Sequence, residues 1–192
     1  MNTNMVSQQA HEQSRTRFTK LISHSASFAL GMTLAAVGLL IAVPGANAAT
    51  TVSNPDRDFM LAAAQGGMTE VKLGELAAQK GMRNDVKEFG QRMVKDHKAI
   101  NDGLKALAAQ KDVTLPSSLD AQHQEMVDKM AALTGSAFDD AYIANMIKGH
   151  KQDAKAFKAE SAETKDADLK SFLEKSIPIV DEHLKLITAM KK

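Results

Sequence analysis

Cysteine and tryptophan are absent from the 192-residue chain, and aromatic residues make up only 4% of it. Without cysteine, the protein has no disulfide bond, no thiolate metal site and no thiol nucleophile. With so few aromatic residues, its core must be built from Leu, Ile, Val, Met, Ala and a few Phe side chains. This composition favours helices, because strands are enriched in β-branched and aromatic residues.

An excess of charge of either sign is also missing, since 24 basic and 23 acidic residues give a formal net charge of +1. Without the leader described below, 21 basic and 22 acidic residues remain, a net charge of −1. Such a balanced chain offers no polyanion-binding surface, so we expect no nucleic-acid partner. The chain also lacks a Ser-His-acid spacing, a phosphate loop and a nucleotide fingerprint. An enzymatic function is therefore the least supported hypothesis, and no catalytic residue is assigned.

Residues 1–48 are organised like a secretory signal. Three basic side chains at residues 15–20 precede an apolar run at residues 26–43, and the small residues Ala-Asn-Ala follow at residues 46–48. Signal peptidases accept this order of features, so we expect cleavage after Ala48 and export, most simply to the periplasm. An uncleaved membrane anchor is the alternative, because the apolar run is nearly long enough to span a bilayer.

The rest of the chain divides into a short tail at residues 49–57 and a helical domain at residues 58–192. Apolar residues recur there at spacings of three and four, which is typical of helices with one buried face. The expected helices, four long and one short, lie at about 55–80, 84–111, 120–133, 136–163 and 167–190. Asn54, Asn84 and Ser136 are the expected N-caps of the first three long helices.

The connection between the second and third long helices is about 25 residues long and contains the short helix. It is long enough to carry the chain from one end of a bundle to the other, as the single crossover of ferritin-like bundles does. We therefore predict an all-α fold: a ferritin-like four-helix bundle of two helical hairpins, with a short extra helix in the crossover. No segment after residue 48 is apolar enough to span a membrane.

Each of the four apolar stripes is interrupted near its middle by one ionisable residue. The first stripe runs through Phe59, Ala63 and Gly66 before this residue. The four interrupting residues are Glu70, His97, His150 and His183. At about 1.5 Å per residue, each lies roughly 20–25 Å from the turn of its hairpin, so all four can share one layer. Buried titratable groups are costly unless they are paired, and a transition metal such as Zn, Cu, Fe or Mn would pair these four.

Three further residues lie near this layer. Asp153, one turn beyond His150, is a candidate for a further ligand or an outer partner. Met93 and Met146 each precede a stripe histidine by four residues. Their thioethers would favour Cu(I) if they pointed inward, although methionine in a helix core ordinarily packs. His123 in the short helix is expected at the surface.

The alternative to a metal site is a hydrogen-bonded Glu–His layer that only fixes the packing of the helices. On that hypothesis the protein is a structural or envelope-interaction protein. If the layer instead binds a metal ion, the protein is a metal-binding or stress-related module.

Four segments of the chain are similar to one bacterial family: GMTEVKLGELAAQKG, VKEFGQRMVKDH, VTLPSSLDAQHQEMVDKMAALTGSAFDDAYIANMIKGH and LKSFLEKSIPIVDEHL. The chain thereby resembles exported ferritin-like domains of unknown function, whose members are often labelled outer-membrane or periplasmic proteins. The resemblance extends from about Asp58 to Met190. It implies a ferritin-like bundle and export, and no established activity.

Iron oxidation at a di-iron centre is not expected. Ferritin-like di-iron proteins place a glutamate three residues before a histidine on two helices. The residues at that position before His97 and His183 are Val94 and Val180. The bridging carboxylates of such a centre are therefore missing.

Overall fold

The structure, a computed structural model, describes residues 52–190, which form five helices and no strand. The helices are α1 (Asn54–Lys80), α2 (Asn84–Gln110), α3 (Ala121–Ala131), α4 (Gly135–Glu163) and α5 (Ala167–Ala189). The prediction of an all-helical fold is confirmed. None of these helices is long and apolar enough to cross a membrane.

The predicted signal peptide at residues 1–48 lies outside the described residues. The predicted tail at 49–57 extends too far, because α1 already begins at Asn54. The reason is local: the Ser53 side chain accepts a hydrogen bond from the Asp56 amide at 3.2 Å, and Pro55 fits the first turn. Ser53 is therefore the N-cap, and the assignment of this role to Asn54 is wrong by one residue.

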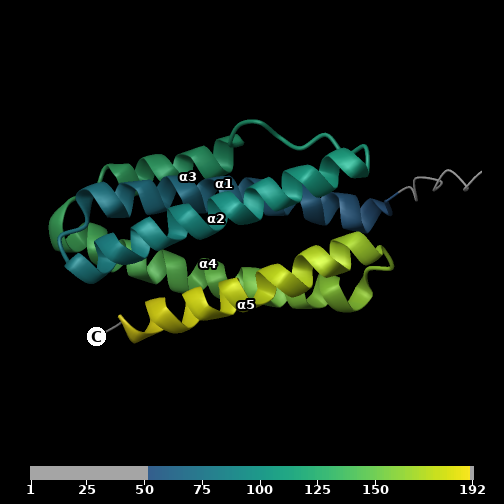
Figure 1. Cartoon of the computed structure of the whole chain (residues 1–192). Helices are drawn as coiled ribbons and strands as arrows, with labels where there is room; N and C mark the ends of the chain where they lie inside the picture. The colour runs from purple at the N-terminus through teal and green to yellow at the C-terminus, as the bar shows by residue number, and fades with distance from the viewer. Residues whose placement is uncertain (1–51, 191–192) are drawn as a thin grey trace, which may run out of the picture. The chain divides into compact units, whose positions relative to one another are not determined.

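Two antiparallel helix pairs, α1 with α2 and α4 with α5, pack against each other (Figure 1). The segment between α2 and α4 runs back along the bundle, and α3 lies against α1 on the way (Figure 1). The side chain of Gln65 on α1 fastens this segment by hydrogen bonds to the Ser118 carbonyl and the Asp120 amide. As a result α4 starts at the same end of the bundle as α2.

The N-terminus of α2 is capped from another helix. The carboxylate of Asp139 on α4, only 1% exposed, accepts hydrogen bonds from the backbone amides of Met82 and Arg83 at 3.0 and 2.8 Å. Asn84 is the first residue of α2 and not its cap. Asp139 therefore joins the two hairpins, because a carboxylate stabilises free amides at a helix start.

The N-cap of α4 is Thr134, without a side-chain hydrogen bond, and the prediction of Ser136 for this role is wrong. Gly135 adopts φ of +60°, a left-handed conformation that glycine tolerates, and it starts the helix one residue before Ser136.

Two apolar clusters fill the interior, one toward each end of the bundle. One cluster includes Leu73, Phe89, Met93, Phe138, Tyr142, Met146 and Ile187. The other includes Met60, Leu104, Leu107, Phe157, Leu169, Leu173 and Val180. Along every long helix, the residue that interrupts the predicted stripe lies between members of these two clusters. A polar layer therefore separates the two apolar halves of the core.

The backbones of α1 and α2 lie close together at Gly74 and Gly90. A Cβ atom on Gly90 would lie 2.7 Å from the Gly74 carbonyl oxygen and 2.7 Å from the Ala78 backbone nitrogen. A Cβ atom on Gly66, in contrast, would meet nothing within 4 Å. The first pair of glycines therefore permits the tight packing of this hairpin, whereas Gly66 does not.

Gly90→Ala is expected to destabilise the protein by about 1–3 kcal/mol, because the added methyl forces two backbones apart. Gly66→Ala is the matched control and is expected to stabilise by roughly 0.5–1 kcal/mol, since it relieves the entropic cost of a helical glycine. Urea unfolding followed by circular dichroism measures both free energies. Equal stabilities of the two variants would contradict the close approach of α1 and α2.

Candidate metal centre

The polar layer between the two apolar clusters receives one titratable side chain from each long helix. These are Glu70 from α1, His97 from α2, His150 from α4 and His183 from α5, with exposures of 8%, 4%, 0% and 0%. The centroids of the three imidazole rings lie 5.3–5.7 Å apart. The structure thus brings together the four side chains that the sequence singled out.

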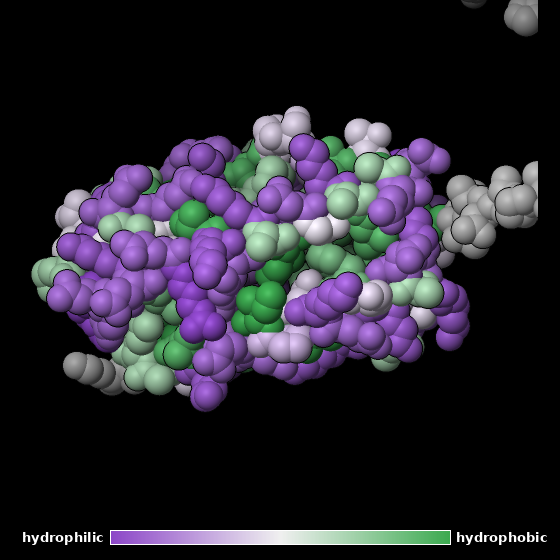
Figure 2. All heavy atoms as spheres, viewed as in Figure 1, coloured by the Kyte–Doolittle hydropathy of each residue, from purple (hydrophilic) through white to green (hydrophobic). Residues whose placement is uncertain are grey.

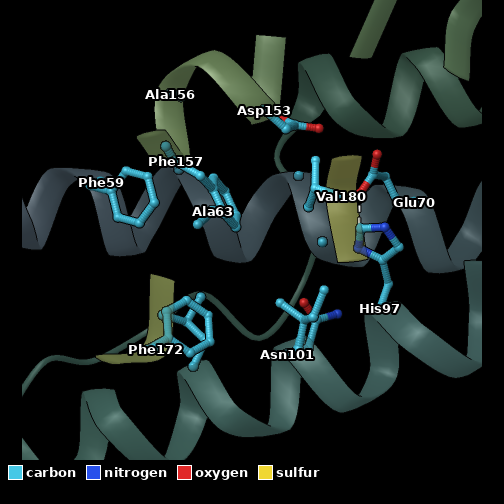
Figure 3. Close-up of a pocket in the computed structure, with 15 residues that line it drawn as sticks. Phe59, Ala63, Glu70, His97, Asn101, Asp153, Ala156, Phe157, Phe172 and Val180 are labelled. Carbon is cyan, nitrogen blue, oxygen red and sulfur yellow. Dashed lines mark ion pairs between the residues drawn. The ribbon is translucent and has the colours of Figure 1, made fainter. Parts of the chain in front are cut away.

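Glu70 holds two of the imidazoles. Its Oε2 lies 2.9 Å from Nδ1 of His97, and its Oε1 lies 3.4 Å from Nδ1 of His150. Figure 3 shows the Glu70–His97 pair. Nδ1 of His150 also donates to the Met146 carbonyl oxygen at 3.0 Å, one turn earlier in α4. In both rings Nδ1 is therefore used as a donor, which leaves Nε2 for another role.

Asp96 binds the third imidazole, that of His183, at Nε2 and not at Nδ1. Its Oδ2 lies 2.9 Å from Nε2 of His183 and 3.3 Å from Nε of Arg92. The Asp96 side chain is 22% exposed, so it connects the buried layer to the surface. Because Nε2 of His183 donates to this carboxylate, Nδ1 of the same ring carries the free lone pair.

One nitrogen of each imidazole is buried without a hydrogen-bond partner among the described residues: Nε2 of His97, Nε2 of His150 and Nδ1 of His183. Each ring can offer one nitrogen such that the three lie within 4.8 Å of one another. Buried polar atoms in native proteins are almost always satisfied. Three orphaned nitrogens on adjoining rings, each ring fixed through its other nitrogen, fit the ligands of a metal ion with their outer partners.

The charges of the layer favour neutral ligands on two of the three rings. Burial lowers the pKa of His183 to about 4, and burial also lowers the pKa of His150. Burial opposes a charge on His97 as well, but the neighbouring Glu70 carboxylate raises the pKa of this imidazole. Burial would raise the pKa of Glu70, yet His97 and His150 lower it to about 2. Glu70 is therefore the anion of the layer.

The auxiliary residues predicted from the sequence lie around the layer. Burial and the charge of Glu70 raise the pKa of Asp153 to about 7, and a hydrogen bond to Glu70 adds to this shift. Met93 and Met146, 0% and 1% exposed, belong to the apolar cluster one turn away. His123 stands apart from the layer, and its Nδ1 lies 2.8 Å from Asp120 at the start of α3.

Asp96 is the residue of this site that sequence reasoning missed. The available signal was its position directly before His97, but adjacent residues on a helix point in different directions. Only the packing of α5 against α2 brings His183 within reach of Asp96.

The family model described as "Domain of unknown function (DUF4142)" matches residues 42–190, and the chain belongs to this family. A search of curated proteins finds no match. Among solved structures, a DUF305 fragment from Deinococcus radiodurans is similar, with a TM-score of 0.63 and 8% identity over 72% of this chain and 96% of that one.

Two structures of a protein called CopM are similar as well. The form titled as Cu(I)-bound has a TM-score of 0.59 and 17% identity, covering 70% of this chain and 94% of that chain. The form titled as Ag-bound by soaking has a TM-score of 0.58 and 17% identity, covering 70% and 93%. At such identities these likenesses show a shared helical-bundle fold.

Proposed function

We propose that this member of the DUF4142 family binds a single transition-metal ion, Cu(I), through His97, His150 and His183. Two observations carry the proposal: each of the three buried imidazoles has one unpartnered nitrogen, and each ring can offer a nitrogen within 4.8 Å of those of the other two. Three nitrogens bound to one metal at about 2.0 Å stand roughly 3.5 Å apart. Side-chain shifts on the order of 1 Å are therefore enough to form the site.

Imidazole nitrogens suit copper among the transition metals, and the similar solved structures favour Cu(I). The three proposed ligands are imidazoles, and the nearest buried anion is Glu70, whose oxygens are engaged with Nδ1 of His97 and His150. The Cu(I)- and Ag-bound titles of the CopM structures, which share the fold, support the same choice.

Glu70 and Asp96 act in this proposal as positioning residues and not as ligands. Each carboxylate accepts a hydrogen bond from the ring nitrogen that would not bind the metal. Such outer partners fix the tautomer and the orientation of a ligating histidine. Asp153 in turn contacts Glu70. Met93 and Met146 pack in the core, and no thioether is needed among the ligands.

The wider proposal is an exported, ferritin-like bundle of the periplasm that holds copper during metal stress. The leader-like residues 1–48 support export, and the return of the chain between α2 and α4 supports the ferritin-like topology. The competing proposal is a purely structural layer. This alternative is favoured by the contacts of Glu70 and Asp96 with the three imidazoles, which link the four long helices without any metal.

Metal stoichiometry separates the two proposals. The purified protein, loaded anaerobically with excess Cu(I) and then desalted, is expected to retain one copper per chain by elemental analysis. Its melting temperature is expected to rise, since an ion that binds only the folded state stabilises it. Copper-free protein with an unchanged melting temperature would support the structural layer and contradict the metal site.

A further inference from the structure

A cavity of about 120 Å³ begins at the polar layer and extends toward the N-terminal end of α1 and the C-terminal end of α4 (Figure 3). Its walls away from the layer are apolar, with the rings of Phe59, Phe157 and Phe172 and the side chain of Leu104. Phe59 and Phe157 meet edge to face, with ring centroids 5.3 Å apart. Gly66 also lines this space, and a Cβ atom there would touch nothing, which confirms that the cavity is open beside α1.

The other end of the cavity is polar. Glu70, His97, Asn101 and Asp153 line it, and Figure 3 shows Asn101 between the aromatic rings and the Glu70–His97 pair. Oδ1 of Asn101 is buried and has no hydrogen-bond partner among the described residues. The amide packs over Gly67, where a Cβ atom would lie 2.0 Å from Oδ1. The unsatisfied acceptor thus lies against α1, and it meets a ligand in the cavity when the amide turns away from Gly67.

The way in lies between the two helix pairs. The lining residues come from α1, α2, α4 and α5, and two of them, Ala62 and Ala156, are exposed. On the face seen in Figure 2, apolar residues also come to the surface in a hollow between the two pairs. The wall of the cavity therefore reaches the surface of the bundle.

We propose that this cavity binds a small neutral aromatic alcohol of the phenol class, with its ring among Phe59, Phe157 and Phe172. Its hydroxyl donates to Oδ1 of Asn101, whose amide turns away from Gly67 to accept this hydrogen bond. A closed apolar cavity of roughly 150 Å³ accepts benzene, so this space of about 120 Å³, whose wall reaches the surface, holds at most one six-membered ring. Aromatic walls favour a flat ring in edge or offset contact. The Glu70 carboxylate at the polar wall disfavours an anion, and the orphaned acceptor demands a donor. The proposal does not depend on a bound metal.

Calorimetric titration of the metal-free protein with phenol tests this inference, with benzene, benzoate and benzylamine as probes of similar size. Phenol is expected to bind saturably, with a roughly millimolar Kd or tighter, and benzoate is expected not to bind. Ala63→Leu fills the cavity and is expected to weaken phenol binding at least about tenfold. Ala162→Leu, at an exposed position of α4 outside the cavity, is the matched control and is expected to bind like the parent.

Two further variants keep the test decisive if Ala63→Leu fails to fold. Phe172→Ala enlarges the cavity, so 2-naphthol is expected to bind this variant and not the parent protein. Asn101→Leu removes the acceptor, and phenol is then expected to lose its advantage over benzene. No saturable phenol binding by the parent protein, or equal binding by the parent and Ala63→Leu, would overturn the proposal. Tighter binding of benzylamine than of phenol would overturn it too, in favour of a cation site at the carboxylates.

Discussion

The His183→Ala protein is expected to bind Cu(I) more than about 100-fold more weakly than the parent protein. Loss of an outer partner of a ligating histidine costs roughly 10–100-fold in metal affinity, and loss of a ligand itself costs more. The side chain is 0% exposed and its Nδ1 is one of the three orphaned nitrogens, so its removal takes one of the three proposed ligands from the centre. Competition against a chromophoric Cu(I) chelator under anaerobic conditions measures the difference.

His123→Ala is the matched control for this experiment. His123 is the only histidine of the described residues outside the layer, with its side chain 27% exposed and paired with Asp120. Its replacement is expected to leave the Cu(I) affinity unchanged within about twofold. Equal losses in both variants would mean that copper binds the histidines without a defined site.

Glu70→Ala is expected to destabilise the metal-free protein by about 3–5 kcal/mol, the usual cost of removing one partner from a buried ionic pair. The Glu70 carboxylate is 10% exposed and faces Nδ1 of both His97 and His150. Without it, the buried His97 imidazole loses the acceptor of its Nδ1 hydrogen bond. A fall in the melting temperature of roughly 10 °C or more follows for a chain of this size.

Glu75→Ala gives the comparison for the same helix. The Glu75 carboxylate is 35% exposed and pairs with Lys72 and Lys98 at the surface. Surface ion pairs of this kind contribute about 0–1 kcal/mol, so this variant is expected to unfold close to the parent. Thermal unfolding in the presence of a chelator compares the two. Similar melting temperatures for both variants would show that the layer is not a tight buried pair.

The helices were predictable because their apolar residues recur with the period of a helix, and the polar layer was predictable because four residues break that period. The identity of the buried face was less certain along α1. The periodicity indicated Phe59, Ala63 and Gly66, whereas Met60, Ala64 and Gly67 are the buried residues. Adjacent positions of a helix can both border a wide buried face, so the periodicity does not separate them. Phe59, Ala63 and Gly66 line the cavity.

The hydrogen-bond network of the site could not be predicted from the sequence. Which nitrogen of each ring is free depends on the partner of the other nitrogen, and two of those partners come from distant segments. Asp96 reaches His183 across 87 positions of the chain, and Glu70 on α1 reaches His150 on α4. Such contacts depend on how the two helix pairs dock, which local patterns do not encode.

X-ray absorption at the copper edge of the Cu(I)-loaded protein tests most directly whether the free nitrogens of His97, His150 and His183 converge on one ion. We expect a first shell of three nitrogen scatterers at about 2.0 Å, with the outer-shell scattering of imidazole rings. A first shell containing sulfur, which Met93 or Met146 would supply, or a shell without imidazole scattering, would contradict the three-histidine centre.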